Sequence, residues 1–313
     1  MKIRRTLAGV AALGAGLAVL VAPAAPAPGA TDCRSVSIAE ALPATTPVLS
    51  WSENLAYDRS GALWVSRGQE NAIERYDTHG RMTGSVRVEA PGAVRLGPDG
   101  RMYATTGTSP ENLVLLGRGT VVSFDPESPG SAPRVVARGL GMPNGLAIAG
   151  DGSMYVADSA LGLVRIMRDG VIDRDWTARA PKSLAPTTVA NGIALNGIAI
   201  RGNDAYVGFT ESLSGRILRV PLDRPEAATA AVDVTAPLPG LVDDLAWLDD
   251  RRLAVTTTTG QVVVTDRRTG ARCTVQAGRP LTSLAVAPDG KSAVAGTIDG
   301  AVLRLRGGPF TAR

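Results

Sequence analysis

Histidine and cysteine are scarce in this chain of 313 residues, and their scarcity disfavours several kinds of site chemistry. The single histidine, His79, follows Asp77-Thr78 and precedes Gly80, a combination typical of a turn. No Gly-x-Ser-x-Gly element occurs, and with its only histidine in a turn the chain offers no histidine to pair with a serine nucleophile, which argues against a serine hydrolase. Zinc is disfavoured for a related reason, because borderline metals recruit imidazole or thiolate ligands.

The cysteine content is also low, with only Cys33 near the start and Cys273 late in the chain. In an oxidising compartment such a pair is expected to form a disulfide. Two free thiols are the alternative.

An excess of charge is missing once the first thirty residues are set aside. Lys2, Arg4 and Arg5 precede an apolar run over 7–21 and a stretch of small residues, which is the pattern of a secretory signal peptide. The run is too short to span a bilayer comfortably. We therefore predict a secreted, extracellular protein without a membrane anchor, with a signal peptide over 1–30 that is cut within 24–30.

The remaining chain is nearly neutral, because loss of those three cations lowers the formal net charge from +4 to +1. A nucleic-acid partner normally requires a basic surface, so we expect none. The length of about 280 residues is enough for one large domain, predicted over 31–313.

Self-similarity is what the chain has in abundance. A pattern of an opening residue, an alternating apolar strand, a tight turn and a second strand occurs six times, beginning at Glu53, Gly92, Asn144, Asn196, Asp243 and Thr282. A repeat of about 40–50 residues indicates a propeller or a solenoid. A third strand follows each copy, fourth strands fit most of them, and no long amphipathic helix competes. The chain is therefore predicted to be an all-β, six-bladed β-propeller.

The two ends of the chain indicate how the ring closes. After the third strand of the last copy only 307–313 remain, whereas the segment 33–38 (CRSVSI) precedes the first copy and has no blade of its own. We expect this N-terminal segment to supply the missing outer strand, which removes an exposed sheet edge. A Cys33–Cys273 disulfide would then tie the closing strand to the outer strand of the neighbouring blade.

Equivalent positions of a closed ring converge on one axis, so the opening residues should meet at one mouth of the central channel. Glu53, Asn144, Asn196 and Asp243 offer only oxygen atoms, which favours a hard divalent cation, and Ca²⁺ tolerates such a mixed set best. The other two copies begin at Gly92 and Thr282, which are not expected to bind a metal. The alternative is structural, because Asn-Gly is a common turn former and polar residues also begin strands in propellers without a metal.

Two assignments at the mouth have alternatives. Asn191-Gly192 offers a second register in the fourth copy, but Asn196 stands at the same distance from its hairpin as the other opening residues, and we choose it. Asp244 follows Asp243 directly, so it either points away as a solvated loop acid or reaches the ion.

The order of these four residues resembles the senescence marker protein/gluconolactonase/luciferin-regenerating (SGL) family and, more distantly, the paraoxonases. ENLAYD is similar to the family's Glu-Gly-Pro-x-Trp-Asp opening, with a departure at Asn54-Leu55. PNGLAI and NGIAIRG match its Asn-Gly motifs, and DDLA stands where the family has Asp-Gly-Leu-Ala. The resemblance covers essentially the whole chain after residue 30.

The resemblance implies roles for individual residues. Glu53, Asn196 and Asp243 would hold one divalent cation, and Asn144 would contact the substrate or add a ligand. Paraoxonases have an Asp-Asn pair at the fifth position, so Asp244 would be a further ligand. Sugar-lactone members often have Arg before the first Asn, whereas here Met142-Pro143 precede it. Together with Trp51 near the mouth, Met142 favours an apolar substrate.

The resulting expectation is a secreted, calcium-dependent hydrolase of a lactone or related ester. The cation would polarise the carbonyl group, and Asp243 or Asp244 would activate water. One alternative is a binding propeller with a structural ion. A strictosidine-synthase-like enzyme is another, although the last copy opens with Thr282-Ser283 and offers no acid. Specificity is expected in the loops 106–116 and 178–188, and the substrate and the oligomeric state stay open.

Overall fold

The computed structural model describes residues 33–44, 46 and 50–311. The predicted signal peptide and its cleavage site lie outside the described residues. Within the described ranges, no helix is long and apolar enough to cross a membrane. A compact unit extends over Thr31–Arg313, and it is built almost entirely of β-strands.

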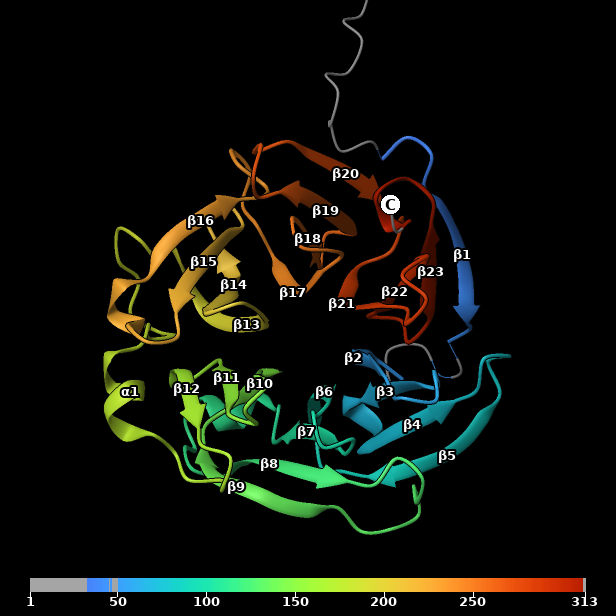
Figure 1. The fold of residues 1–313 in the computed structure, drawn as a ribbon, viewed down its shortest axis with the longest axis horizontal. Helices are drawn as coiled ribbons and strands as arrows, with labels where there is room; N and C mark the ends of the chain where they lie inside the picture. The colour runs from blue at the N-terminus through green and yellow to red at the C-terminus, as the bar shows by residue number, and fades with distance from the viewer. Residues whose placement is uncertain (1–32, 45, 47–49, 312–313) are drawn as a thin grey trace, which may run out of the picture. The chain divides into compact units, whose positions relative to one another are not determined.

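Six antiparallel sheets follow one another around a central axis, which confirms the predicted six-bladed propeller (Figure 1). In each blade the first strand lies next to the axis, and successive strands lie further out. The first two blades contain β2 (Ser52–Tyr57), β3 (Leu63–Arg67), β4 (Ala72–Tyr76), β5 (Met82–Arg87), β6 (Pro91–Leu96), β7 (Met102–Thr106), β8 (Gly119–Phe124) and β9 (Arg134–Leu140). The fourth and fifth contain β13 (Gly192–Arg201), β14 (Asp204–Ser212), β15 (Arg216–Pro221), β16 (Thr229–Asp233), β17 (Val242–Trp247), β18 (Arg252–Thr257), β19 (Gln261–Asp266) and β20 (Arg272–Gln276).

The third blade departs from the four-stranded expectation. It has three strands, β10 (Pro143–Ile148), β11 (Met154–Asp158) and β12 (Gly162–Ile166), and the short helix α1 (Arg174–Arg179) follows them. The side chain of Asp173 caps the helix by accepting the Trp176 backbone N–H at 3.0 Å. The buried Trp176 indole donates to the Leu222 carbonyl of the next blade at 2.7 Å. These contacts favour a helix where a fourth strand would have run.

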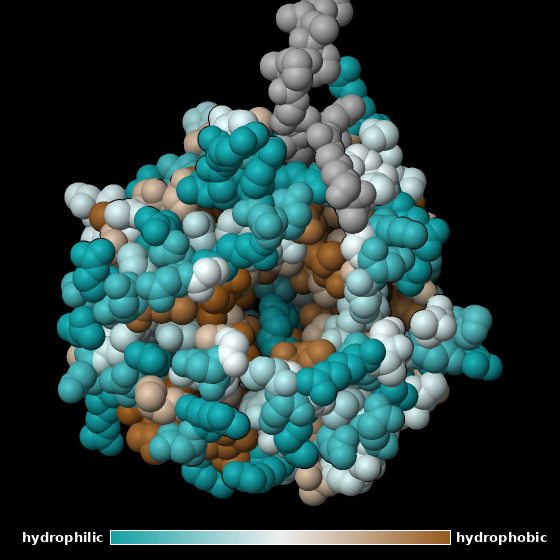
Figure 2. Space-filling model, in the orientation of Figure 1, coloured by the Kyte–Doolittle hydropathy of each residue, from teal (hydrophilic) through white to brown (hydrophobic). Residues whose placement is uncertain are grey.

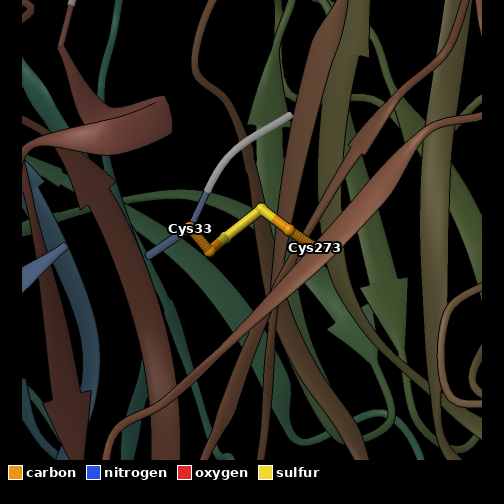
Figure 3. Close-up of a disulfide and its surroundings, with 2 residues drawn as sticks. All are labelled: Cys33 and Cys273. Carbon is orange, nitrogen blue, oxygen red and sulfur yellow. A yellow bond between two sulfur atoms is a disulfide. The ribbon is translucent and has the colours of Figure 1, made fainter. Parts of the chain in front are cut away.

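The N-terminus closes the ring as predicted. The sixth blade has the order β1 (Ser37–Leu42), β23 (Val302–Arg306), β22 (Ser292–Thr297) and β21 (Leu281–Val286), so its outermost strand comes from the other end of the chain (Figure 1). The strand begins four residues later than expected, because Cys33 lies in a turn in which its carbonyl accepts the Val36 N–H. The predicted Cys33–Cys273 disulfide is present and joins this turn to β20 (Figure 3).

The hydrophobic core is divided among the seams between neighbouring blades. Six clusters of buried apolar residues occur, one for each pair of adjacent sheets. Alternation along each strand supplies both faces of a blade with apolar side chains, so every sheet packs on two neighbours. This packing fixes the inner strands around the axis and therefore the positions of their opening residues.

Candidate metal and active site

The opening residues of the repeats lie in β-bulges of the innermost strands. In β2, Ser52 and Asn54 have partners on β3, whereas Glu53 between them has none. The same irregularity occurs at Asn144, Asn196 and Asp243. A bulge adds one residue to one strand and re-aims its side chain, and bulges are frequent beside functional sites. The repeated bulge releases these side chains from the ordinary alternation of the strand.

One cavity of 690 Å³, here called the anchor cavity, gathers most of the predicted site residues. Its lining includes Trp51, Glu53, Met142, Asn144, Asn196 and Asp243. A view down the ring axis shows a hollow at the centre, with a hydrophilic floor and hydrophobic residues around it (Figure 2). Residues from blades one, three, four and five are therefore neighbours in space, as the propeller geometry requires.

The alternative register at Asn191 does not reach this cavity. The Asn191 amide donates to Ser214 Oγ at 2.6 Å, and its Oδ1 accepts from Ser212 Oγ at 2.8 Å. Asn196 lines the anchor cavity instead. The structure therefore favours the register with Asn196.

Asn196 and Asp243 are joined by a hydrogen bond at the base of the site. The Asn196 amide nitrogen donates to Asp243 Oδ1 at 3.0 Å and to Thr210 Oγ1 at 2.8 Å. Because both amide hydrogens are engaged, the carbonyl oxygen of Asn196 is the atom left to bind a ligand. Among the described residues, none donates a hydrogen bond to the carboxylate of Glu53.

The electrostatics of the site show uncompensated negative charge. Burial raises the pKa of Glu53 from 4.5 to about 7, and the charge of Asp244 adds to the shift. Burial also raises the pKa of Asp243 well above its ordinary value, with further contributions from the charges of Glu53 and Asp244 and an opposing hydrogen bond from Asn196. Carboxylates confined together without a counter-charge disfavour ionisation.

A divalent cation fits this set of residues. Among the described residues there is no cluster of three or more His, Cys, Asp and Glu side chains suited to a metal. A cation held by Glu53 and Asp243 would therefore need amide oxygens as further ligands. Two carboxylates with amide oxygens are the donors that Ca²⁺ accepts. Glu53, Asn196 and Asp243 supply such donors, with Asn144 in the same cavity.

Asp244 lies in a separate network and does not line the anchor cavity. Arg95 Nη2 donates to its two carboxylate oxygens at 3.2 and 3.3 Å, and Asn54 Nδ2 donates to Oδ2 at 3.2 Å. The Leu284 N–H approaches the same oxygen at 3.3 Å. The Asp244 side chain is 2% exposed. This network joins the inner strands β2, β6, β17 and β21. Asp244 points into it, and not into the cavity that Asp243 lines, because neighbouring residues of a strand point in different directions.

The expectation from sequence missed Arg95 and Asn54, although one signal for them existed. The third and fourth copies have Gly145 and Gly197 after the opening residue, whereas the first and fifth have Asn54 and Asp244. A Cβ at Gly145 would lie 2.1 Å from the Asn196 carbonyl oxygen, so glycine permits a close approach of two blades there. Asn54 and Asp244 put polar side chains at this buried position in the first and fifth copies, and buried polar side chains need hydrogen-bonding partners.

Backbone strain is concentrated around the anchor cavity. Within the described ranges, positive φ at non-glycine residues occurs at Asn71 (55°), Ala90 (36°) and Ala194 (60°), and all three line this cavity. Such conformations cost free energy, and they cluster at functional sites. The Asn71 side chain holds one of them by accepting the Ala90 N–H at 2.7 Å.

The rest of the lining combines acidic, neutral polar and apolar residues. It contains Glu89 and Glu111 besides Glu53 and Asp243, and among the described residues it contains no Lys, Arg or His. Leu113 and Ile298 add apolar surface to that of Trp51 and Met142. Of the two loops expected to carry specificity, 106–116 lines the cavity through Thr108–Glu111 and Leu113, whereas 178–188 does not.

Comparison with known proteins places the chain by its fold. No family model and no curated protein matches the sequence. A gluconolactonase from Xanthomonas campestris superposes with a TM-score of 0.65 at 16% identity, covering 91% of this chain and 98% of that one. Regucalcin from Agrobacterium tumefaciens, described as a calcium-binding protein, gives 0.62 at 17% identity, covering 86% and 93%.

The same fold also carries other chemistry. Virginiamycin B lyase from Staphylococcus aureus, solved with quinupristin, gives a TM-score of 0.59 at 12% identity, with 87% of this chain and 99% of that one covered. The chain therefore has the β-propeller fold that gluconolactonase, regucalcin and this lyase share. At such identities the likeness establishes the fold, and the activity has to be argued from the site.

Proposed function

We propose that this chain is a divalent-cation-dependent hydrolase of lactones or related esters. The observation that carries the proposal is the convergence of Glu53, Asn144, Asn196 and Asp243 in one cavity of 690 Å³. The resemblance of these four residues to the SGL family, in the same order along the chain, supports it. The gluconolactonase and the calcium-binding regucalcin among proteins of this fold support it further.

Glu53, Asn196 and Asp243 would hold the cation, with Ca²⁺ as the best match to their oxygen donors. A bound divalent cation supplies a Lewis acid that polarises a carbonyl group. Asn144 lines the same cavity and would orient the substrate or add a ligand.

Asp243 is the proposed general base. It lines the cavity and accepts one hydrogen bond from Asn196 on Oδ1, whereas Asp244 is engaged by Arg95, Asn54 and Leu284. Asp243 would remove a proton from water as the water oxygen bonds to the carbonyl carbon. The carbon–oxygen bond of the ester then breaks, and the leaving alkoxide takes up the proton. Asp244 would act only through its effect on the site's charge.

The proposed substrate is uncharged and partly apolar. Trp51 and Met142 give the cavity apolar walls, and none of the described lining residues is a cation that could pair with a substrate anion. Glu89 and Glu111 would repel an anionic group at the rim. Secretion is part of the proposal and agrees with the disulfide, because such bonds persist in oxidising compartments.

A panel of neutral lactones and aryl esters tests the proposal when it is assayed with Ca²⁺ and after treatment with chelator. We expect hydrolysis that disappears with chelator and returns with Ca²⁺. Asp243→Asn should abolish hydrolysis with folding intact, whereas Asp223→Asn, at an exposed loop position, should not change it. Hydrolysis that survives complete removal of the cation would contradict the proposal.

The alternative is a binding propeller in which a cation has a structural role. This alternative is supported by regucalcin, a protein of the same fold that is described as calcium-binding. This alternative predicts that Ca²⁺ raises the melting temperature while no lactone or ester is hydrolysed. It also predicts that Asp243→Asn lowers thermal stability in the presence of Ca²⁺.

A further inference from the structure

A second cavity lies away from the anchor cavity, at the seam where the N-terminal strand closes the ring. This seam cavity has a volume of 720 Å³ and is lined by residues of β1, β23, the turn between β21 and β22, and the first blade. The apolar cluster of this seam includes Leu42, Leu63 and Val302 among its buried residues.

The wall of the seam cavity contains a cation without a partner. Arg304 follows Val302 by two residues on β23, so the two side chains share the face toward the first blade. Val302 is buried in the apolar cluster, and Arg304 lines the cavity and is half-buried. Among the described residues, no carboxylate forms an ion pair with Arg304. Lys291 and Arg306 line the same cavity.

The carboxylates of the lining are engaged elsewhere. Asp77 pairs with Arg81 at 2.8 Å, and Glu40 pairs with Arg279 at 2.8 Å. Asp289 is exposed at a hairpin turn, and its Oδ1 accepts the Lys291 N–H at 2.9 Å. Among the described residues, Arg304 is therefore a charged group of this cavity that is partly removed from water and has no ion-pair partner, a combination that favours binding of an anion.

Apolar side chains, among them Leu42 and Leu63, and the hydroxyl group of Tyr57 also line the seam cavity. Burial raises the pKa of the Tyr57 hydroxyl, while the charge of Arg304 opposes the shift and that of Asp289 adds to it. All three residues line this cavity. Within the described ranges, no group forms a hydrogen bond with the Tyr57 hydroxyl, so it remains available as a donor.

We infer that the seam cavity is a binding site for a carboxylate that carries an apolar chain. The guanidinium of Arg304 and the hydroxyl of Tyr57 would bind the carboxylate, and Leu42 and Leu63 would contact the chain. Arginine is suited to this role because its planar fork of donors matches a carboxylate. The site is separate from the anchor cavity and does not depend on the proposed hydrolysis.

Calorimetric titration with octanoate, octanamide and octylammonium at matched ionic strength tests the inference. We expect one site for octanoate and weaker binding of the other two, with the same octanoate affinity before and after treatment with chelator. Arg304→Gln should weaken octanoate binding by about tenfold or more, because a charge-assisted hydrogen bond is lost. Arg138→Gln, at an exposed position on β9, is the matched control and should leave binding unchanged.

Binding of octanoate that is lost with chelator would assign it to the anchor cavity and overturn the inference. Equal affinities for octanoate and octanamide, or no effect of Arg304→Gln, would do the same. Crystals of the unaltered protein soaked with 8-bromooctanoate give a test that needs no variant. Bromine in the seam cavity supports the inference, and bromine only at other positions, or none, contradicts it.

Discussion

Replacing Glu53 with glutamine should stabilise the cation-free protein at pH 8. Burial and the charge of Asp244 raise the pKa of Glu53 from 4.5 to about 7. One pKa unit corresponds to about 1.4 kcal/mol, so the rise from 4.5 to about 7 means that ionisation of this carboxylate in the folded protein costs at most about 3.5 kcal/mol. The side chain is half-buried, and screening by solvent lowers the expected cost to about 2 kcal/mol.

The pH window follows from the direction of the shift. Between about pH 4.5 and pH 7, the folded protein keeps a proton on Glu53 that the unfolded chain has released. The free energy of unfolding of the cation-free protein therefore rises as the pH falls through 7, and the gain is complete near pH 4.5. Above pH 7 Glu53 is ionised in the folded protein as well, and the full cost of this ionisation lowers the free energy of unfolding. Glutamine cannot ionise, so Glu53→Gln removes this part of the pH dependence.

Urea unfolding of chelator-treated protein from pH 5 to pH 8.5 measures the effect, with Glu127→Gln as an exposed control. The slope that remains in Glu53→Gln reports Asp243, whose pKa is also raised. Added Ca²⁺ should stabilise the unaltered protein at pH 8 and have little effect on Glu53→Gln. Identical pH profiles for the two proteins, or equal stabilisation by Ca²⁺, would refute the reasoning.

Arg95→Leu removes the ion pair of the buried Asp244 and should lower the free energy of urea unfolding by about 3–5 kcal/mol, whereas Arg179→Leu, in an exposed ion pair, should cost less than about 1 kcal/mol. Equal losses would contradict the burial argument. Replacing Cys33 and Cys273 with serine should cost about 3–5 kcal/mol in thermal unfolding, because the bond closes a loop with a sequence separation of 240, and an unchanged melting temperature would show that it contributes nothing. If the hydrolysis we propose is found, lactones with a carboxylate or phosphate substituent should have kcat/KM values at least about tenfold below those of neutral analogues, because the cavity lining is acidic. Equal values would argue against a substrate-binding role for Glu89 and Glu111.

The repeat made the architecture predictable, because each copy carries its own strand pattern and turn. Closure of the ring was predictable from the imbalance between the two ends of the chain, and β1 and the disulfide confirm it. The helix α1 was not predicted. Its cap at Asp173 is a local signal, but the packing of Trp176 against the next blade is a tertiary contact.

The candidate site was predictable in part for a similar reason. Glu53, Asn144, Asn196 and Asp243 occupy equivalent positions, so knowledge of the ring was enough to bring them together. The direction of Asp244 was not predictable, because it depends on a bulge in β17 and on Arg95 from another blade.

The sequence by itself determined the number of blades, the closing strand, the cysteine pair and the set of oxygen-bearing residues at the inner strands, since all of these follow from local pattern and periodicity. Only the tertiary structure decided which acid lines the anchor cavity, which acid lies in the network with Arg95, and where a second cavity lies beside Arg304. These outcomes depend on side chains from blades distant in the sequence, and no local pattern encodes how such side chains share space and charge.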